Sequence, residues 1–269
     1  MKPAPFEYLR AASVDEVVAA LASCGADGRE AKILAGGQSL VPLLALRMAR
    51  PDVLVDINRV ADLSDLALVN GVLHVGALTR HSALATQTDH PLLAEAARWI
   101  GHPAIRSRGT AAGSLAHADP SAELSVVAVA CGATVSVVGP GGVRSAPAAD
   151  LFTGPLMSTL AEDELITSVS FPVPARWGFA EFARRHGDFA LVTAVVADGA
   201  IALGGVSAVP MRSVAGERLL AGGGSVGEVT AAVCAELDPT GDLHASAPYR
   251  RALAVELLGR ALRQAGVPC

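Results

Sequence analysis

Two glycine-containing segments of this sequence have the residue types that bind phosphate groups. In the first, residues 31–40 read AKILAGGQSL, so that Gly36 and Gly37 stand between two apolar runs. Glycine allows backbone angles that other residues resist, and it lets main-chain N–H groups approach a ligand closely. A strand-to-helix connection presents such groups to an anion, and phosphate is the usual guest. A tight turn without a ligand is the alternative interpretation.

The second segment, residues 108–114, reads RGTAAGS and offers hydroxyl groups at Thr110 and Ser114 as well as backbone donors. Two loops of this kind would suit a ligand with a pyrophosphate and a long polar tail, held by amides rather than lysines. Neither loop carries an obvious general base or nucleophile. Any chemistry at this site would therefore come from the ligand itself.

Three further motifs could do chemistry, and each has a plainer interpretation. Residues 222–227, GGGSVG, match a dinucleotide fingerprint but follow a helical pattern instead of a strand, so we interpret them as a linker between two helices. Residues 114–123, SLAHADPSAE, hold Ser, His and Asp too close in sequence for a catalytic triad and offer too few zinc ligands. Residues 184–189, RRHGDF, form a solvated turn or place Phe189 against a flat cofactor ring.

The predicted helices and strands that would position these segments do not follow a regular βαβ order. This favours an α+β fold over a doubly wound sheet. Local signals include a capping box at Ser13 and Glu16 and hairpin turns at Asn70-Gly71 and Asp198-Gly199. We predict helices at 14–24, 40–51, 81–87, 90–101, 124–133, 214–221, 226–237 and 249–264, strands at 31–34, 52–60, 134–139 and around both hairpins, and a loop-rich passage over 102–123.

Composition limits the classes of function. The 269 residues are 51% hydrophobic and carry a net charge of −5, with no basic stripe for a nucleic acid. The four cysteines form no cluster that could hold iron–sulfur or zinc. The N-terminus lacks the apolar run of a signal peptide, and the most apolar segment, residues 126–138, is too short to cross a bilayer. We expect a soluble cytoplasmic protein.

Seven motifs in order along the chain resemble one family, the FAD-binding medium subunits of the bacterial molybdenum hydroxylases, which include xanthine dehydrogenase and aerobic carbon monoxide dehydrogenase. They are FEYLRAASVDEVVAAL, AGGQSLVPLLALRMARPDVLVDINRV, VGALTRHSAL, IRSRGTAAGSLAHADPSAEL, LFTGPLMSTLAEDELITSVSFP, RRHGDFALV and YRRALAVELLGRAL. The resemblance covers nearly the whole chain, so it is far more specific than either glycine loop alone.

The resemblance implies a two-lobed FAD-binding domain of the vanillyl-alcohol-oxidase/PCMH type over residues 1–172, with lobes of about 1–55 and 56–172. A small α+β C-terminal domain follows over residues 173–269. By the same resemblance, both loops contact the FAD pyrophosphate, Glu123 meets the sugar or ribitol hydroxyls, and Phe189 lies near the isoalloxazine. The implied cofactor-binding residues are Ile33, Leu34, Ala35, Gly36, Gly37, Gln38, Ser39, Leu40, Ile100, Thr110, Ala111, Ala112, Gly113, Ser114, Glu123, Ile166 and Phe189, with Ile100 and Ile166 near the adenine.

One position departs from the family pattern. The family's second loop usually has two adjacent glycines, where this chain has Ala112-Gly113. A methyl group at residue 112 would crowd a close phosphate contact or a backbone with positive φ. Because of this departure, a further alternative stays open, in which the chain is a degenerate relative that has lost FAD and only scaffolds its partners.

The resemblance also implies partners. A small subunit would hold [2Fe–2S] clusters and a large subunit molybdopterin, with the complex assembled as a dimer of heterotrimers. Electrons from substrate oxidation at molybdenum would pass through the clusters to the flavin of this chain and then to an outside acceptor. The alternative is a stand-alone FAD-dependent oxidase of a small molecule, which would need a base near the flavin.

Overall fold

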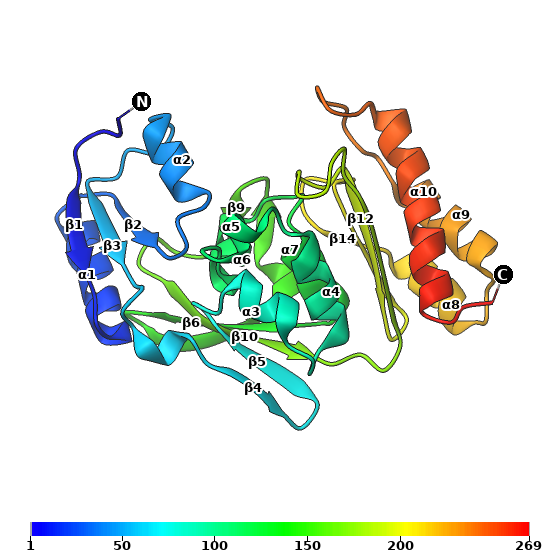
Figure 1. The fold of residues 1–269 in the computed structure, drawn as a ribbon, viewed down its shortest axis with the longest axis horizontal. Helices are drawn as coiled ribbons and strands as arrows, with labels where there is room; N and C mark the ends of the chain where they lie inside the picture. Colours follow the sequence, from blue (N-terminus) through cyan, green and yellow to red (C-terminus); the bar gives the residue numbers. More distant parts are fainter. Residues whose placement is uncertain (1, 269) are drawn as a thin grey trace.

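The N-terminal lobe contains a parallel sheet in the computed structural model, which describes residues 2–268. Its strands run in the order β1 (Glu7–Arg10), β3 (Val53–Asp56) and β2 (Ala31–Leu34), with α1 (Val14–Ala26) and α2 (Leu40–Ala45) in the connections (Figure 1). Ser13 caps α1 by accepting the N–H of Glu16 at 3.2 Å, as predicted. All four residues of β3 are buried, so the central strand anchors the lobe.

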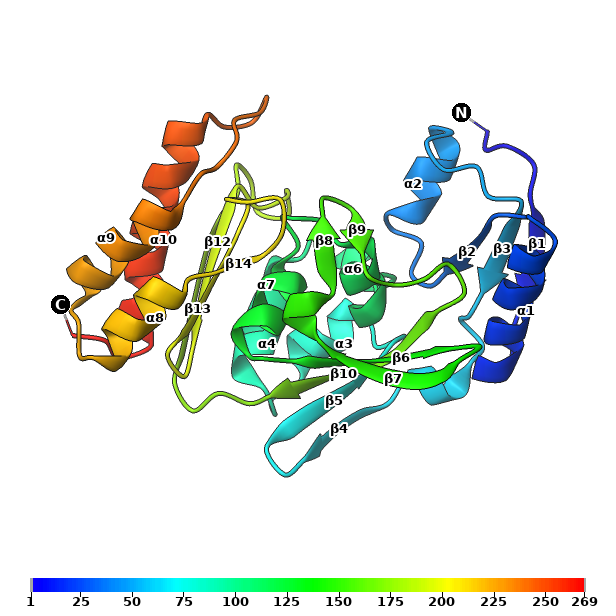
Figure 2. The ribbon, with the colours of Figure 1, turned by 180° about the vertical axis from the view of Figure 1, so that it is seen from behind.

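The second sheet is antiparallel and lies at the middle of the molecule. Its strands run in the order β4 (Leu66–Val69), β5 (Val72–Gly76), β10 (Leu165–Pro172), β6 (Thr134–Gly139) and β7 (Gly142–Pro147). Helices α3 (His81–Thr86), α4 (Pro91–Trp99), α5 (Pro103–Arg106), α6 (Ala111–His117) and α7 (Glu123–Ala130) gather on this sheet. A hairpin of β8 (Phe152–Gly154) and β9 (Met157–Ser158) packs beside α6 (Figure 2). Two 3₁₀ turns, Ala61–Leu63 and Ala148–Asp150, complete this part.

The third sheet has helices on both faces (Figures 1 and 2). Its antiparallel strands are β11 (Trp177–Phe182), β12 (Val192–Ala197), β13 (Ala200–Gly204) and β14 (Met211–Arg212). Helices α4 and α7 cover one face, and α10 (Ala247–Gln264) covers the other, with α8 (Val214–Ala221) and α9 (Val226–Glu236) beside it. Every residue of β12 is therefore buried.

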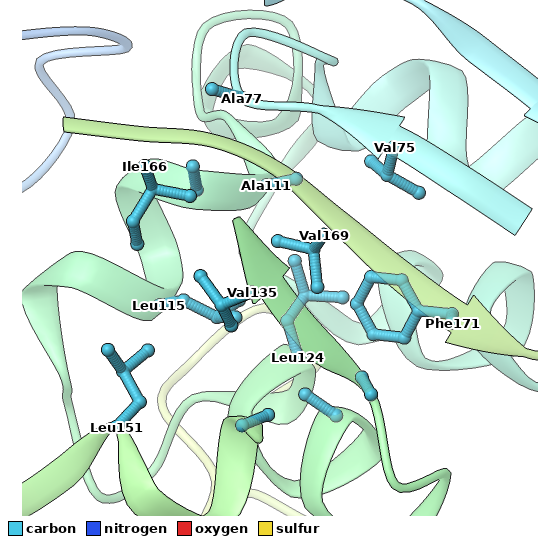
Figure 3. Packing of buried hydrophobic residues seen from close by; sticks show 14 of the residues in the cluster. Val75, Ala77, Ala111, Leu115, Leu124, Val135, Leu151, Ile166, Val169 and Phe171 are labelled. Atoms are coloured by element: carbon cyan, nitrogen blue, oxygen red, sulfur yellow. The ribbon is translucent and has the colours of Figure 1, made fainter. Parts of the chain in front are cut away.

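Two hydrophobic clusters hold these layers together. In the larger cluster, strand residues such as Val135, Val169 and Phe171 pack against Leu115 and Leu124 of the helices (Figure 3). Successive side chains of a strand point to opposite faces, so alternate residues of β12 join different clusters. Val195 and Ala197 belong to the large cluster, and Ala194 and Val196 belong to the cluster under α10. The third sheet thus shares its core with the preceding residues.

Several predictions hold and two are wrong. The chain is α+β, both predicted hairpin turns have positive φ, and residues 222–225 link helix α8 to helix α9. The helix predicted to run to Pro51 ends at Ala45, because Arg47 takes a left-handed φ of 58° and the N–H of Met48 returns to the carbonyl of Leu43. The passage predicted as loop-rich contains α5, which begins at Pro103, and α6, which begins at Ala111 after the capping residue Thr110.

The predicted domain boundary lies in the connection between β10 and β11, at residues 173–176. Since the sheet that follows shares a core with the preceding residues, the division into domains stays a prediction. Among the helices described in residues 2–268, none has the length and apolar character needed to span a membrane.

Candidate functional site

The first glycine loop leaves β2 and enters α2, as predicted, and its backbone donors are free. Gly37 has a φ of 74°, in the region that glycine tolerates best. The first hydrogen bond of the helix runs from the N–H of Val41 to the carbonyl of Gly37 at 2.9 Å. Within residues 2–268, the N–H groups of residues 36–40 have no intramolecular acceptor. Five successive donors are therefore left without a partner in the described chain.

The two loops meet in space. A Cβ atom on Gly36 would overlap the carbonyl oxygen of Arg108 and lie 2.8 Å from the Cα of Gly109. A Cβ atom on Gly113 would lie 3.9 Å from the Cβ of Ala35. The sequence predicted two separate small-residue loops for one ligand, and the fold brings them into contact.

The second segment differs from its prediction, because it forms the first turn of α6 and its amides are already used. The N–H groups of Ala111 and Ala112 bond to the carbonyls of Thr79 at 3.0 Å and Ala77 at 3.3 Å. Those of Gly113 and Ser114 bond to the hydroxyl and the carbonyl of Thr110. The hydroxyl of half-buried Ser114 has no partner in the described chain. Of the hydroxyl and backbone donors predicted for this segment, the Ser114 hydroxyl is therefore free and the backbone amides are not.

The structure places Ala112 in the first turn of α6. Its backbone is helical, so no positive φ is needed there. The side chain is buried and belongs to the large hydrophobic cluster. The methyl group therefore contributes to packing, and its effect on FAD binding stays a prediction.

Glu123 is the first residue of α7 and is buried, together with a second carboxyl group that the sequence reasoning missed. Burial and the nearby Asp119 raise the pKa of Glu123 to about 7. Burial and the charge of Glu123 raise the pKa of Glu181 to about 9, and the hydroxyl of Thr193 donates to Glu181 Oε2 at 3.2 Å. Glu181 Oε1 is buried with no hydrogen-bond partner in the described residues.

The register of the third sheet explains why these carboxyl groups come together. Glu181, Thr193 and Gly204 are cross-strand neighbours on β11, β12 and β13. A Cβ atom on Gly204 would lie 2.6 Å from Val126 Cγ2, so this row faces α7. The signal in the sequence was a single acidic residue inside an otherwise apolar strand, GFAEF.

Ile100 and Ile166 are both in the large hydrophobic cluster. Ile166 is on β10 opposite Val137 and lies among the packed side chains of Figure 3. Ile100 follows α4, and its carbonyl accepts a hydrogen bond from Arg106 at 3.0 Å. Both side chains contribute to the core, and their contact with an adenine ring stays a prediction.

Phe189 is 75% exposed, in the connection between β11 and β12. The His186 ring packs edge-on against Trp99 at the end of α4, with ring centroids 5.6 Å apart. Gly187 has a φ of 91°, and a Cβ atom there would overlap the His102 ring. These contacts hold the loop against the helices of the second sheet while Phe189 projects into solvent.

The residues that the sequence considered as a triad or metal site show no such arrangement. No group of three His, Cys, Asp or Glu side chains in the described part of the chain is placed to hold a metal ion. The structure offers the free amides of the first loop, the Ser114 hydroxyl of the neighbouring segment and, at the start of α7, a buried carboxyl pair. This set can bind an anionic, hydroxyl-bearing ligand.

Comparisons with known proteins agree with this geometry. Residues 4–174 match the family described as FAD binding domain in molybdopterin dehydrogenase, and residues 177–265 match the CO dehydrogenase flavoprotein C-terminal domain. The chain is 41% identical to the 6-hydroxypseudooxynicotine dehydrogenase complex subunit alpha of Paenarthrobacter nicotinovorans, over 98% of this chain and 96% of that protein.

Two further comparisons concern carbon monoxide dehydrogenase of Hydrogenophaga pseudoflava. Its medium chain is 34% identical over the full length of both proteins. A solved structure of that enzyme lacking the Mo-pyranopterin moiety of its cofactor superposes with a TM-score of 0.93, at 35% identity and complete coverage of both chains. The sequence similarity and the structural superposition with this enzyme's medium chain therefore both extend over the entire chain.

Proposed function

This chain belongs to the family of FAD-binding medium subunits of molybdopterin-dependent dehydrogenases, and we propose that it carries electrons from a partner's [2Fe–2S] clusters through FAD to an outside acceptor. It is an oxidoreductase subunit with an FAD-binding domain. The proposal concerns the route of the electrons and the partners that deliver them.

The observation that carries the proposal is the row of free backbone donors at residues 36–40. Successive backbone amides without an intramolecular acceptor can stabilise phosphate oxygens. The donor set as a whole fits FAD, because the pyrophosphate would take these amides together with the Ser114 hydroxyl. Glu123, at the start of α7, would accept hydrogen bonds from the sugar or ribitol hydroxyls.

In this proposal the residues of the chain bind and orient the cofactor. FAD, when bound, supplies the redox chemistry, since a flavin accepts electrons singly and releases them in pairs. The two loops hold the phosphates, the buried carboxyl pair holds a proton beside the hydroxyl site, and exposed Phe189 would lie against the flavin ring. No side chain is assigned as a catalytic acid or base.

The partners follow from the family. We propose a small subunit with [2Fe–2S] clusters and a large subunit with molybdopterin, assembled as a dimer of heterotrimers. The relatives bear names that refer to 6-hydroxypseudooxynicotine and to carbon monoxide, yet they align with nearly all of this chain. This supports a division of labour in which another subunit selects the substrate.

A flavin-binding experiment tests the proposal. The purified chain is incubated with FAD, freed of excess ligand and examined for the visible absorption bands of bound flavin. Stoichiometric flavin supports the proposal, and its absence after reconstitution contradicts it. The electron route is tested with the co-expressed complex, in which substrate should reduce the flavin only when the iron–sulfur partner is present. A chain that reduces its own flavin with a small substrate and no partner would instead be a stand-alone oxidase.

A further inference from the structure

Arg80 connects the two loops of the candidate site. It is half-buried and stands between β5 and α3, where its backbone pairs with Thr110. Its guanidinium donates through Nη1 to the carbonyl oxygen of Arg108 and through Nη2 to Asn58 Oδ1, the latter at 2.7 Å. Through its bond to Arg108, the Arg80 side chain is therefore attached to the segment that leads into α6.

Through its bond to Asn58, the Arg80 side chain is also connected to the first loop. Asn58 Nδ2 donates to the carbonyl oxygens of Ala35 at 2.9 Å and Leu34 at 3.3 Å, the residues just before Gly36. Asp56 holds the asparagine side chain, because its Oδ1 accepts from Asn58 Nδ2 at 2.6 Å. A continuous chain of hydrogen bonds thus runs from the first loop through Asn58 and Arg80 to the carbonyl of Arg108.

The charge of Arg80 is not neutralised by an acid. Among the described residues, no carboxylate forms an ion pair with its guanidinium. Burial lowers the pKa of Arg80, and the neighbouring Arg108 lowers it further, while Asp56 acts in the opposite direction. An arginine stays protonated under such conditions, so a full positive charge lies between the two loops.

We infer that Arg80 is the positioning residue of the dinucleotide site: its forked guanidinium fixes the spacing of the two loops and leaves a positive charge beside the cofactor's phosphates. The inference rests on the proposed function, since it places the FAD pyrophosphate at these loops. A lysine cannot replace the fork, because one ammonium group on a flexible stem does not span the carbonyl of Arg108 and the amide of Asn58 together.

The test compares FAD affinities of the full-length chain and its variants, measured by titrating flavin-free protein with FAD. R80M removes the fork and the charge, and R80K keeps the charge alone. R98M is the matched control, because Arg98 also donates to a main-chain carbonyl, that of Ala85, and to a side-chain oxygen, Glu95 Oε2, yet touches neither loop. Thermal unfolding of each flavin-free variant is recorded in parallel.

We expect R80M and R80K each to weaken FAD binding by at least about tenfold, because charge-assisted hydrogen bonds that set the loop spacing are lost. R98M should stay within about twofold of the wild type, since surface ion pairs contribute little. Flavin-free R80K should unfold at nearly the temperature of R98M, whereas a merely structural role would lower its unfolding temperature and spare the affinity of the folded protein. If R80M does not fold, R80K decides the question.

A double variant gives a second, independent measurement. R80M and N58S interrupt the same chain of hydrogen bonds, so the double variant should bind FAD about as weakly as either single variant. If the losses of FAD affinity in R80M and N58S add fully in the double variant, the inference is contradicted. It is also contradicted if R80K and R80M bind FAD as tightly as the wild type. A wild-type chain that binds no FAD would overturn the proposed function and this inference together, whereas wild-type binding with unaffected Arg80 variants overturns the inference alone.

Discussion

Gly36 and Arg108 are in direct backbone contact, because the position that a Cβ atom would take on Gly36 overlaps the carbonyl oxygen of Arg108. That same carbonyl accepts a hydrogen bond from Arg80. The glycine pair therefore does more than turn the chain. Its first member lets two distant segments touch, and its second, with a φ of 74°, turns the chain toward α2.

Gly36→Ala should abolish stable FAD binding, because the added methyl group pushes the first loop away from Arg108 and Gly109. Flavin content after reconstitution, read from the visible absorption bands, measures the effect. Gly227→Ala is the control, since nothing lies within 4 Å of a Cβ there and α9 should gain about 1 kcal/mol from the better helix former. Full flavin occupancy in Gly36→Ala would show that the loop contact is dispensable.

Ala112→Gly should leave FAD affinity unchanged and lower the free energy of unfolding. The alanine methyl group is buried and the backbone is helical, so glycine would cost about 1–2 kcal/mol in lost burial and helix propensity. Chemical denaturation and FAD titration of the same variant separate the two effects. Tighter FAD binding by the glycine variant would mean that the methyl group does crowd the cofactor.

Glu181 should make the protein's stability depend on pH. Burial and the charge of Glu123 raise its pKa in the folded chain far above the 4.5 of an ordinary glutamate. The folded protein therefore keeps a proton that the unfolded chain loses, and this contribution to stability is fully present below pH 4.5. It is lost as the pH rises toward about 9, by up to about 1.4 kcal/mol per pH unit.

Glu181→Gln removes this titration while keeping the shape of the protonated acid. The unfolding temperature of the variant relative to the wild type should therefore increase steadily from pH 5 to pH 9, and calorimetry across that range measures it. Glu123 and Asp119 remain in both proteins, and because the charge of Glu123 acts on Glu181, the difference reports the titration of this carboxyl pair. A difference that stays constant with pH would mean that Glu181 is ionised in the folded chain throughout.

Phe189→Ala should change the surroundings of the bound flavin and spare the fold. Since the ring is 75% exposed, its removal should alter the free energy of unfolding by less than about 0.5 kcal/mol. Quenching of flavin fluorescence by iodide should increase, because a ring that shields the isoalloxazine is gone. Leu243→Ala, at a side chain that is 97% exposed, is the matched control. Equal quenching in both variants would place Phe189 away from the flavin.

The sequence by itself determined the features that depend on a few neighbouring residues. Asn70-Gly71 and Asp198-Gly199 make hairpin turns because both residues of each pair accept positive φ. Ser13 caps α1 because its hydroxyl lies within reach of the N–H of Glu16. The family assignment also followed from sequence alone, since seven motifs occur in order.

Local signals failed where a short segment could adopt either state. Residues 46–51 are compatible with a helix, but Arg47 takes a left-handed conformation and the helix ends before it. Residues 111–117 are small and polar enough for a loop, but the N–H groups of Ala111 and Ala112 find the carbonyls of Thr79 and Ala77. Those contacts come from another part of the chain and carry no signature in the segment itself.

Only the tertiary structure decided which donors and charges are left without an acceptor or a counter-ion among the described residues. It left the amides of residues 36–40 free, used those of residues 111–114 and placed Arg80 between the two loops. It also brought Glu181 from the third sheet to Glu123 of α7. The physical reason is that a turn or a cap depends on dihedral preferences within a few residues, whereas hydrogen-bond partners and buried charges depend on the register and packing of elements that are distant in sequence.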